Sequence, residues 1–325
     1  MNFVDYAEQY FENQKNFIRA SSLSVYLGRF DKYIKPFFKN YKLSELNSRL
    51  AQQFLNYLCS CKKEDGKQLS KHTIQDTLVL FKSIAYDAMR EGIIQEFTFK
   101  TKMPNNVYQP LQEMKMLKQN DYENLIEFLT NNFSAENVAI MISLQAGLRI
   151  GEVCGLKWEK VCFEDNYIRV DNIVNRLWKE REKTSEIIES TPKTFSGIRN
   201  IPMSNILREY LLEWKKRKYI IGYDENGLPE AKEPPKNYFV LRDIKPEEPR
   251  VLRNKAYKTL KSLGIDYIHF HNLRHTFCSV GLQKGVDIKV MSEFMGHAGT
   301  DITLNIYTHT TEAQRQQALE KINSF

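Results

Sequence analysis

The stretch AGLRIGEVCGLKW, residues 146–158, follows an apolar run at 138–144 that has no polar face. Such a run predicts a fully buried helix. Gly147 can end that helix, and Arg149 then begins another, with Glu152 three residues further on. An arginine among apolar neighbours needs an anion. Arg149 and Glu152 therefore form either an ion pair on a helix surface, or an arginine that Glu152 holds and directs at a phosphate.

Residues 3 to 96 are predicted to be helices, because their apolar residues recur at helical spacing. Ser21 or Ser22 can cap one helix and Ser70 can cap another. Basic residues form a stripe outside the apolar face of the first of these helices, at Arg29, Lys32 and Lys35. The stripe is either a solvated face or a face that follows a phosphate backbone.

The chain changes character after this helical part. Residues 97–112 contain two prolines without periodicity, which is typical of a linker. Two β-prone runs flank a turn at Glu164–Asn166, and residues 197–203 and 238–242 read as short strands. Residues 172–191 are predicted to be a long exposed hairpin or insertion, and residues 222–237 a loop. Helices resume at residue 251.

The pattern predicts a mainly α chain with a small antiparallel β-sheet. It is divided into a helical domain at 1–100, a linker at 101–112 and a mixed α+β domain at 113–325. Globular composition is indicated by 42% hydrophobic and 27% charged residues. Apolar runs are too short to cross a membrane, and no secretion signal is present. Five cysteines without framework spacing predict a reduced, cytoplasmic protein. The net charge of +7 leaves nucleic-acid binding open.

A second notable stretch, HFHNLRHTF at 269–277, holds three of the six histidines. His271 and Arg274 lie three residues apart and share a helix face. His271 and His275 have the spacing of a zinc helix, with Cys278 nearby. Arg274 would place a cation beside the metal, and no carboxylate follows His271 as in the zinc-protease motif. The residues therefore favour a phosphoryl group over a metal ion.

Two more segments complete the set. Lys193 lies in a turn in TPKTFSGIRNIP, residues 191–202. A turn lysine is usually only solvated, but it can also protonate a leaving oxygen. In EFMGHAGTDITLNIYTH, residues 293–309, Gly296 ends a short helix, His297 follows it, and Tyr307 can act as a nucleophile where surrounding charge activates it. No acidic cluster for Mg²⁺ and no phosphate-binding glycine loop is apparent, so covalent DNA cleavage without metal or nucleotide is indicated.

Taken in order, four segments resemble the motifs of the tyrosine recombinases, the phage integrase family. They are GLRIGEVCGL, PKTFSGIRNIP, HNLRHTF and MGHAGTDITLNIYTH. The resemblance implies a helical core-binding domain followed by a catalytic domain. It also implies the site residues: Tyr307 as nucleophile, Arg149 and Arg274 on the scissile phosphate, Lys193 as general acid, His271 in proton transfer, His297 on a phosphate oxygen, and Glu152 as support. His269 and His275 fall outside the motif and are expected to be core or turn residues.

The function implied is a site-specific recombinase or integrase of a mobile element. It would cleave and rejoin double-stranded DNA through a 3′-phosphotyrosyl intermediate, with no cofactor. A homotetramer on two DNA sites and an accessory directionality factor are further implications. The C-terminal tail would dock on a neighbouring protomer or on its own domain. Two alternatives remain: a nicking-closing enzyme like the type IB topoisomerases, and a catalytically silent DNA-binding regulator.

Overall fold

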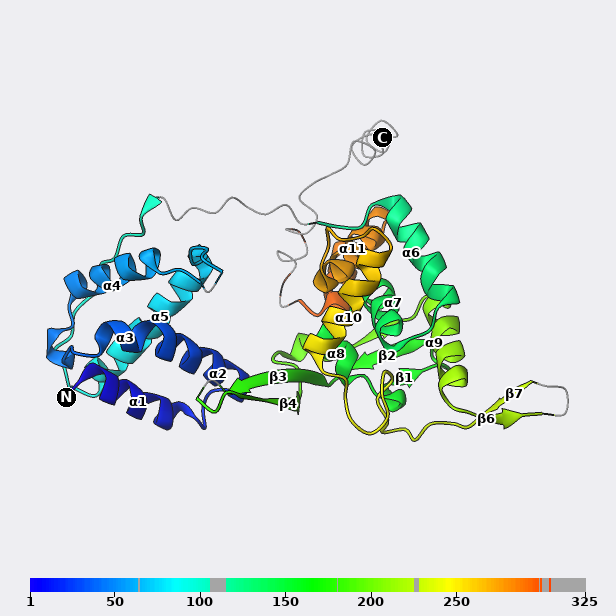
Figure 1. The fold of residues 1–325 in the computed structure, drawn as a ribbon, viewed down its shortest axis with the longest axis horizontal. Coiled ribbons are helices and arrows are strands. Elements are labelled where there is room, and N and C mark those ends of the chain that lie inside the picture. Colours follow the sequence, from blue (N-terminus) through cyan, green and yellow to red (C-terminus); the bar gives the residue numbers. More distant parts are fainter. Residues whose placement is uncertain are drawn as a thin grey trace, which may run out of the picture. The chain divides into compact units, whose positions relative to one another are not determined.

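The computed structural model describes residues 1–63, 65–105, 115–179, 181–224 and 228–297, together with Gly299 and Leu304. The chain forms two compact units (Figure 1). Each unit has its own hydrophobic core. The first unit comprises Met1–Gln112 and Leu177–Glu186, and the second comprises Glu113–Arg176 and Ile187–Phe325. Within the described ranges, no helix is both long enough and apolar enough to cross a lipid bilayer.

Helices build most of the first unit: α1 (Phe3–Gln14), α2 (Ala20–Arg29), α3 (Lys35–Phe38), α4 (Ser48–Ser60) and α5 (Lys71–Arg90). The hydroxyl of Ser70 accepts a hydrogen bond from the backbone N–H of Thr73, which confirms the predicted cap of α5. The prediction of Ser21 or Ser22 as the cap of α2 is wrong. Both serines lie inside the first turn, because α2 begins at Ala20.

Aromatic side chains fill the core of the first unit. Phe38 lies at its centre, with its ring centroid 4.5 Å from that of Phe3, 5.0 Å from Phe54 and 4.8 Å from Phe81. All four rings are fully buried. Because rings of this size remove large apolar areas from water, this cluster contributes much of the driving force that folds the helical unit.

The predicted basic stripe is partly neutralised within the first unit. Arg29 forms an ion pair of 2.7 Å with Asp76, and Lys35 forms one of 3.1 Å with Glu8. The ammonium group of Lys32 lies 5.9 Å from the ring centroid of Tyr33. Neither of the two simple interpretations of this stripe is therefore complete, since Arg29 and Lys35 each already have a carboxylate partner.

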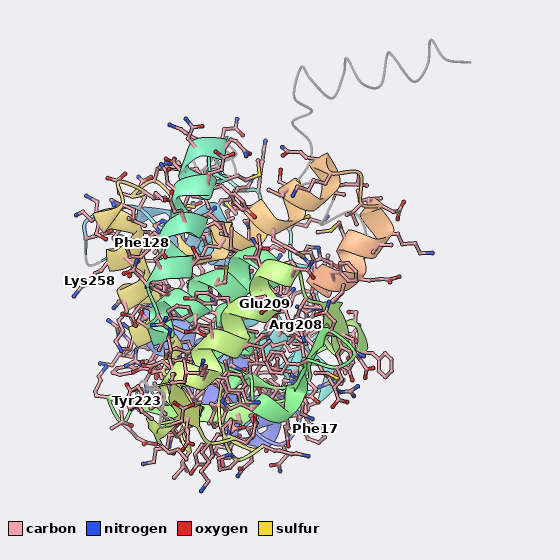
Figure 2. All side chains as sticks on the ribbon, turned by 90° about the vertical axis from the view of Figure 1, so that its right-hand side faces the viewer. Phe17, Phe128, Arg208, Glu209, Tyr223 and Lys258 are labelled. Carbon is pink, nitrogen blue, oxygen red and sulfur yellow. The ribbon has the colours of Figure 1, made fainter. Side chains whose placement is uncertain are left out.

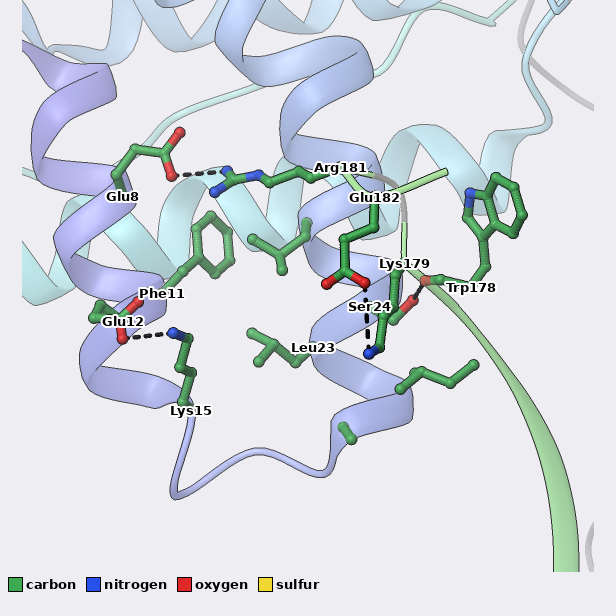
Figure 3. Close-up of a pocket in the computed structure, with 13 residues that line it drawn as sticks. Glu8, Phe11, Glu12, Lys15, Leu23, Ser24, Trp178, Lys179, Arg181 and Glu182 are labelled. Atoms are coloured by element: carbon green, nitrogen blue, oxygen red, sulfur yellow. Dashed lines mark hydrogen bonds and ion pairs between the residues drawn. The ribbon is translucent and has the colours of Figure 1, made fainter. Parts of the chain in front are cut away.

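Residues 172–191 contain a hairpin of β3 (Ile173–Lys179) and β4 (Thr184–Ser190). The outer part of the hairpin, Leu177–Glu186, belongs to the first unit. Arg181 donates hydrogen bonds to Glu8 at 2.7 Å and to Asp31 at 3.2 Å. These contacts border a cavity of about 400 Å³ with Phe11 and Leu23 among its lining residues (Figure 3).

The second unit combines helices with a three-stranded sheet. Its helices are α6 (Gln119–Asn131), α7 (Ala135–Ala146), α8 (Ile150–Gly155), α9 (Asn205–Lys218), α10 (Pro249–Ser262), α11 (Phe270–Gln283) and α12 (Ile288–Met295). The sheet has the order β1 (Val161–Cys162), β2 (Tyr167–Val170) and β5 (Arg199–Pro202), and all its pairs are antiparallel.

Helix α7 is the central element of this unit. It contacts α6, α8, α9, α10 and α11, and every residue from Val138 to Leu144 is at most 1% exposed. The prediction of a fully buried helix from the apolar run is confirmed. Strand β5 places Ile201 opposite Ile168 in the sheet, and side chains two residues apart share a face. Arg199 therefore points to the same buried side as Ile201.

Two local predictions are wrong. Part of the expected loop at 222–237 pairs instead, as β6 (Ile220–Tyr223) with β7 (Pro229–Ala231). The expected strand at 238–242 is absent, and Phe239 makes only an isolated bridge with Lys157. Phe239, Val240 and Leu241 are nevertheless buried, so the apolar residues of this segment indicate core packing and not strand pairing. The broader prediction, a mainly helical chain with small antiparallel sheets, is confirmed.

The surface of the second unit carries charge on α9. Figure 2 shows Arg208 and Glu209 next to each other on this helix, and their side chains form an ion pair of 2.7 Å. The last turn of α9 is basic, which suits the negative end of a helix dipole. Water screens the ion pairs on this exposed face, in contrast to the buried charges of the same unit.

Candidate active site

Arg149 lies where the buried helix α7 gives way to α8. Gly147 ends α7 in the left-handed conformation with φ of 66°, and the backbone N–H of Arg149 then donates to Glu152 Oε2 at 2.8 Å. The guanidinium of Arg149 also donates to Glu152 Oε1 at 2.9 Å. The Glu152 side chain is only 1% exposed whereas that of Arg149 is 37% exposed. Arg149 and Glu152 therefore do not form a surface ion pair. The carboxylate of Glu152 is buried, and the partly exposed guanidinium of Arg149 lies between it and the solvent.

Glu152 has a second cationic partner, which the sequence analysis missed. Arg199 on β5 donates to Glu152 Oε1 at 3.1 Å and to Oε2 at 3.0 Å, and its side chain is 6% exposed. Burial favours the protonated carboxyl, but the hydrogen bonds and charges of Arg199, with those of Arg149 and Arg274, lower the pKa of Glu152 below its usual value. The alternation of side chains along β5 could have indicated that Arg199 is buried, because it lies on the same inward face as Ile201.

Arg274 on α11 is almost completely buried, with 1% of its surface exposed. It donates to the carbonyl of Gly147 at 2.5 Å and to the carbonyl of Met295. Burial, together with the charge of Arg149, lowers the pKa of Arg274 to about 9, so the guanidinium remains charged at neutral pH. A buried cation held by carbonyls has no full counter-charge, which makes it receptive to an anion.

The end of α12 brings the three arginines together. The carbonyls of Phe294, Met295 and Gly296 are consecutive, and each accepts a hydrogen bond from a different arginine: Arg199 at 2.6 Å, Arg274, and Arg149 at 3.3 Å. The carboxyl end of a helix carries partial negative charge, which stabilises cations there. His297 follows this helix end directly.

The histidines differ in environment. His271 lies in the first turn of α11 and is exposed, yet desolvation and the charges of Arg274 and Arg149 lower its pKa. The ring centroid of His275 lies 4.5 Å from that of His271, and burial lowers the pKa of His275 to about 4. Burial and the arginine charges likewise lower the pKa of His297 to about 4. His269 is exposed and is the N-cap of α11, where its backbone N–H donates to the Asn272 side chain at 2.7 Å.

Lys193 is exposed in the turn between β4 and β5. The end of this turn contacts the arginine cluster, because Arg199 donates to the carbonyl of Gly197 at 3.0 Å. A Cβ atom on Gly296 would lie 2.9 Å from the carbonyl oxygen of Ser196. The turn that bears Lys193 is thus packed against the end of α12.

Two further points concern the predicted site. Tyr307, the predicted nucleophile, and the C-terminal tail lie outside the described residues. Across the residues that the structure does describe, no group of three or more His, Cys, Asp or Glu side chains could hold a metal ion. What the structure brings together is Arg149, Glu152 and Arg274, beside His297 and the turn after Lys193.

Both parts of the chain match known protein families. Residues 115–314 match the Phage integrase family, and residues 2–59 match its N-terminal SAM-like domain. The chain belongs to the phage integrase family. It is a tyrosine recombinase, as the four motifs predicted. The resemblance stated from the sequence is therefore confirmed.

Similar proteins extend the match along the chain. A XerC-like tyrosine recombinase of Caldanaerobacter subterraneus is 27% identical over 94% of this chain and 78% of its own length. A probable prophage integrase of Lactococcus lactis is 26% identical over 99% and 82%. The integrase of transposon Tn1549, solved with transposon right end DNA, has a TM-score of 0.70 at 21% identity, covering 99% of this chain and all of that one. The recombinase therefore shares the tyrosine recombinase fold over both units.

The left-handed turn at Gly147 should be sensitive to substitution. In the recombinase, Gly147→Ala would place a Cβ 2.5 Å from the Phe277 ring and would strain a φ of 66°. We expect a loss of about 2–4 kcal/mol in the free energy of unfolding, measured by denaturant titration. Gly264→Ala is the matched control, because Gly264 has φ of 75° and open space, so only about 1 kcal/mol should be lost. Equal losses would contradict the packing argument.

The lowered pKa values of the histidines predict that the recombinase loses stability in mild acid. His275 and His297 titrate near 4 when folded but near 6.5 when unfolded, so the unfolded chain binds more protons between these values. Their contribution should be complete above about pH 6.5 and should decline as the pH falls toward 4. The thermal midpoint should fall as the pH is lowered from 8 to 5, and this fall should be smaller in the His275→Gln variant. An unchanged slope in this variant would contradict the assignment.

Proposed function

We propose that this recombinase cuts and rejoins duplex DNA at a specific site through a temporary bond between Tyr307 and a 3′ phosphate. The observation that carries the proposal is the meeting of Arg149 and Arg274 at the end of α12, immediately before His297. Guanidinium and imidazole groups at one place supply the donors that a phosphodiester and its transition state need.

The two arginines would bind the scissile phosphate. In the DNA-free protein, a carbonyl of Gly296 accepts from Arg149 and a carbonyl of Met295 accepts from Arg274. A phosphate oxygen carries more charge than a peptide carbonyl and makes a stronger hydrogen bond with a guanidinium. We infer that the phosphate competes for these donors, while Glu152 keeps Arg149 in place.

The remaining groups would handle protons. Lys193 lies on the exposed turn and would donate a proton to the leaving 5′ oxygen. His271 would serve in proton transfer at Tyr307. His297, which is neutral at pH 7 because its pKa is about 4, would donate its one N–H to a phosphate oxygen. A bound phosphate would raise this pKa by adding negative charge nearby.

The reaction balances without an external energy source. The Tyr307 hydroxyl gives its proton to His271 and its oxygen attacks phosphorus, the P–O5′ bond breaks, and the 5′ oxygen leaves as a hydroxyl after it takes a proton from Lys193. The phosphotyrosyl bond keeps the energy of the original diester. A 5′-hydroxyl from another duplex can then attack the same phosphorus and release Tyr307, which exchanges strands.

We infer several partners from this chemistry. Double-stranded DNA is the substrate, bound by a helical core-binding domain at 1–100 and a catalytic domain at 113–325 joined by residues 101–112. Exchange between two sites requires two duplexes and therefore a homotetramer, with the C-terminal tail docked on a neighbouring protomer. An accessory factor would set the direction. Such a protein of a mobile element would act in the cytoplasm, and its five cysteines are free thiols in the structure.

The test is covalent capture. The protein is incubated in EDTA with a duplex of its recombination site that carries a nick next to the cleavage position, so that the cut fragment diffuses away. We expect an adduct that survives denaturation, with the DNA attached to the peptide that contains Tyr307. Binding without any adduct would indicate a regulator. Relaxation of supercoils without a second site would indicate a topoisomerase-like enzyme.

A further inference from the structure

Arg199 is a buried arginine whose side chain makes four hydrogen bonds inside the protein. Its Nε donates to Phe294, its Nη1 to Gly197 and to Glu152, and its Nη2 to Glu152. Only 6% of the side chain is exposed. These hydrogen bonds go to Glu152 and to two backbone carbonyls, and the ion pair with Glu152 balances the charge of Arg199 inside the protein, whereas Arg274 is held by carbonyls. An effect of Arg199 on the reaction therefore acts through these partners.

We propose that Arg199 is a positioning residue that holds Glu152 and thereby presents Arg149 to the scissile phosphate. The inference rests on the proposed function of Arg149 and adds a residue to it. The two-oxygen pairing of Arg199 with Glu152 is the strong, planar geometry that a guanidinium makes with a carboxylate. It fixes the carboxylate plane, and Arg149 binds the remaining positions on the same two oxygens.

The balance of charge explains why Arg199 would control the position of Arg149. Glu152 is buried and ionised, so it must be balanced by cations nearby. Arg199 supplies that balance from inside the protein, which leaves the charge of Arg149 available to an anion. Without Arg199, Glu152 would draw Arg149 inward as its main partner. The cluster would also fall from two net positive charges to one, since it consists of Arg149, Arg199, Arg274 and the single carboxylate of Glu152.

Arg199 also joins three segments that carry other predicted site residues. Its hydrogen bond to Gly197 holds the turn that follows Lys193, and its hydrogen bond to Phe294 holds the end of α12 before His297. A Cβ atom on Gly296 would lie 3.0 Å from Arg199 Nη1, so the backbone approaches the guanidinium closely. Lysine cannot replace these contacts, because one ammonium cannot span both oxygens of Glu152 and two carbonyls.

The test measures single-turnover cleavage of the nicked duplex by the full chain. Arg199→Met should cleave about 100-fold more slowly than the wild type, with DNA affinity unchanged within about twofold. Arg217→Met is the matched control: Arg217 is 56% exposed and pairs with Glu213 on α9, so its loss should change the rate by less than about twofold. Arg199→Lys serves as a second variant if Arg199→Met does not fold, as judged by its thermal midpoint.

A double-mutant cycle separates positioning from general structural damage. If Arg199 acts through Arg149, then Arg199→Met should slow the Arg149→Lys variant by no more than about threefold. The Arg149→Lys change has already removed the guanidinium through which Arg199 acts. The same factor in both backgrounds would overturn the proposal, as would wild-type rates in both Arg199 variants. A wild type that forms no adduct would instead overturn the proposed function itself.

Discussion

Tyr307→Phe is expected to abolish the covalent DNA adduct while DNA affinity remains within about twofold of the wild type. Phenylalanine keeps the ring but has no oxygen to attack phosphorus, and the rate of cleavage should fall by more than about 10⁴-fold. The measurement is denaturing gel analysis of the nicked duplex, with affinity from a filter or mobility assay. Salt must be held constant, because phosphate contacts make affinity steeply dependent on ionic strength.

Tyr223→Phe is the control for the loss of a tyrosine hydroxyl. Tyr223 lies on β6 and is 67% exposed (Figure 2), so its adduct yield should equal that of the wild type. An adduct that persisted in Tyr307→Phe would show that another side chain is the nucleophile. Loss of DNA binding in this variant would show that Tyr307 contributes to recognition, which the proposal does not include.

Arg274→Lys should produce the next largest loss, a fall of about 10²–10³-fold in single-turnover cleavage. The guanidinium spans the carbonyls of Gly147 and Met295, and in the proposed function it also binds the scissile phosphate. Lysine keeps the charge but presents a single ammonium on a flexible stem, so it cannot hold both carbonyls and the phosphate together. DNA affinity should change little, because most of it comes from other phosphate contacts.

The exposed Arg217 again provides the comparison, and Arg217→Lys should leave cleavage unchanged. A rate for Arg274→Lys within about tenfold of the wild type would mean that only charge matters at this position. A large loss of unfolding free energy with a normal rate per folded molecule would assign Arg274 to stability alone. Both quantities are therefore measured on the same preparation, with cleavage normalised to the folded fraction.

In the proposed function, the end of a helix prepares the arginine cluster to bind an anion. Consecutive carbonyls at the end of α12 offer partial negative charge to Arg199, Arg274 and Arg149. These weak acceptors hold three like charges near one another without neutralising them, and Glu152 neutralises only one. Donors arranged in advance need little reorganisation when the phosphate arrives, which is the main source of electrostatic catalysis.

Much of the fold and of the candidate site could be predicted because local chemistry controlled it. The apolar run at 138–144 predicted the buried α7, and Ser70 predicted the start of α5, since burial and capping depend on adjacent residues. The spacing of Arg149 and Glu152 predicted their contact for the same reason. The order of the four motifs was enough to identify the family, because each motif is short and continuous in the sequence.

Other features depended on contacts between distant segments. Arg199 meets Glu152 across 47 positions of sequence, and nothing near either residue names the other. Pairing of β6 with β7 depends on backbone hydrogen bonds and not on side-chain pattern, while Phe239, Val240 and Leu241 are buried in a segment that forms only an isolated bridge. The amino-acid sequence by itself determined the family and gave the prediction of which residues carry the chemistry. Only the tertiary structure decided that the arginines pair with Glu152 and with the end of α12, because electrostatic interactions depend on distance in space and not on separation in the sequence.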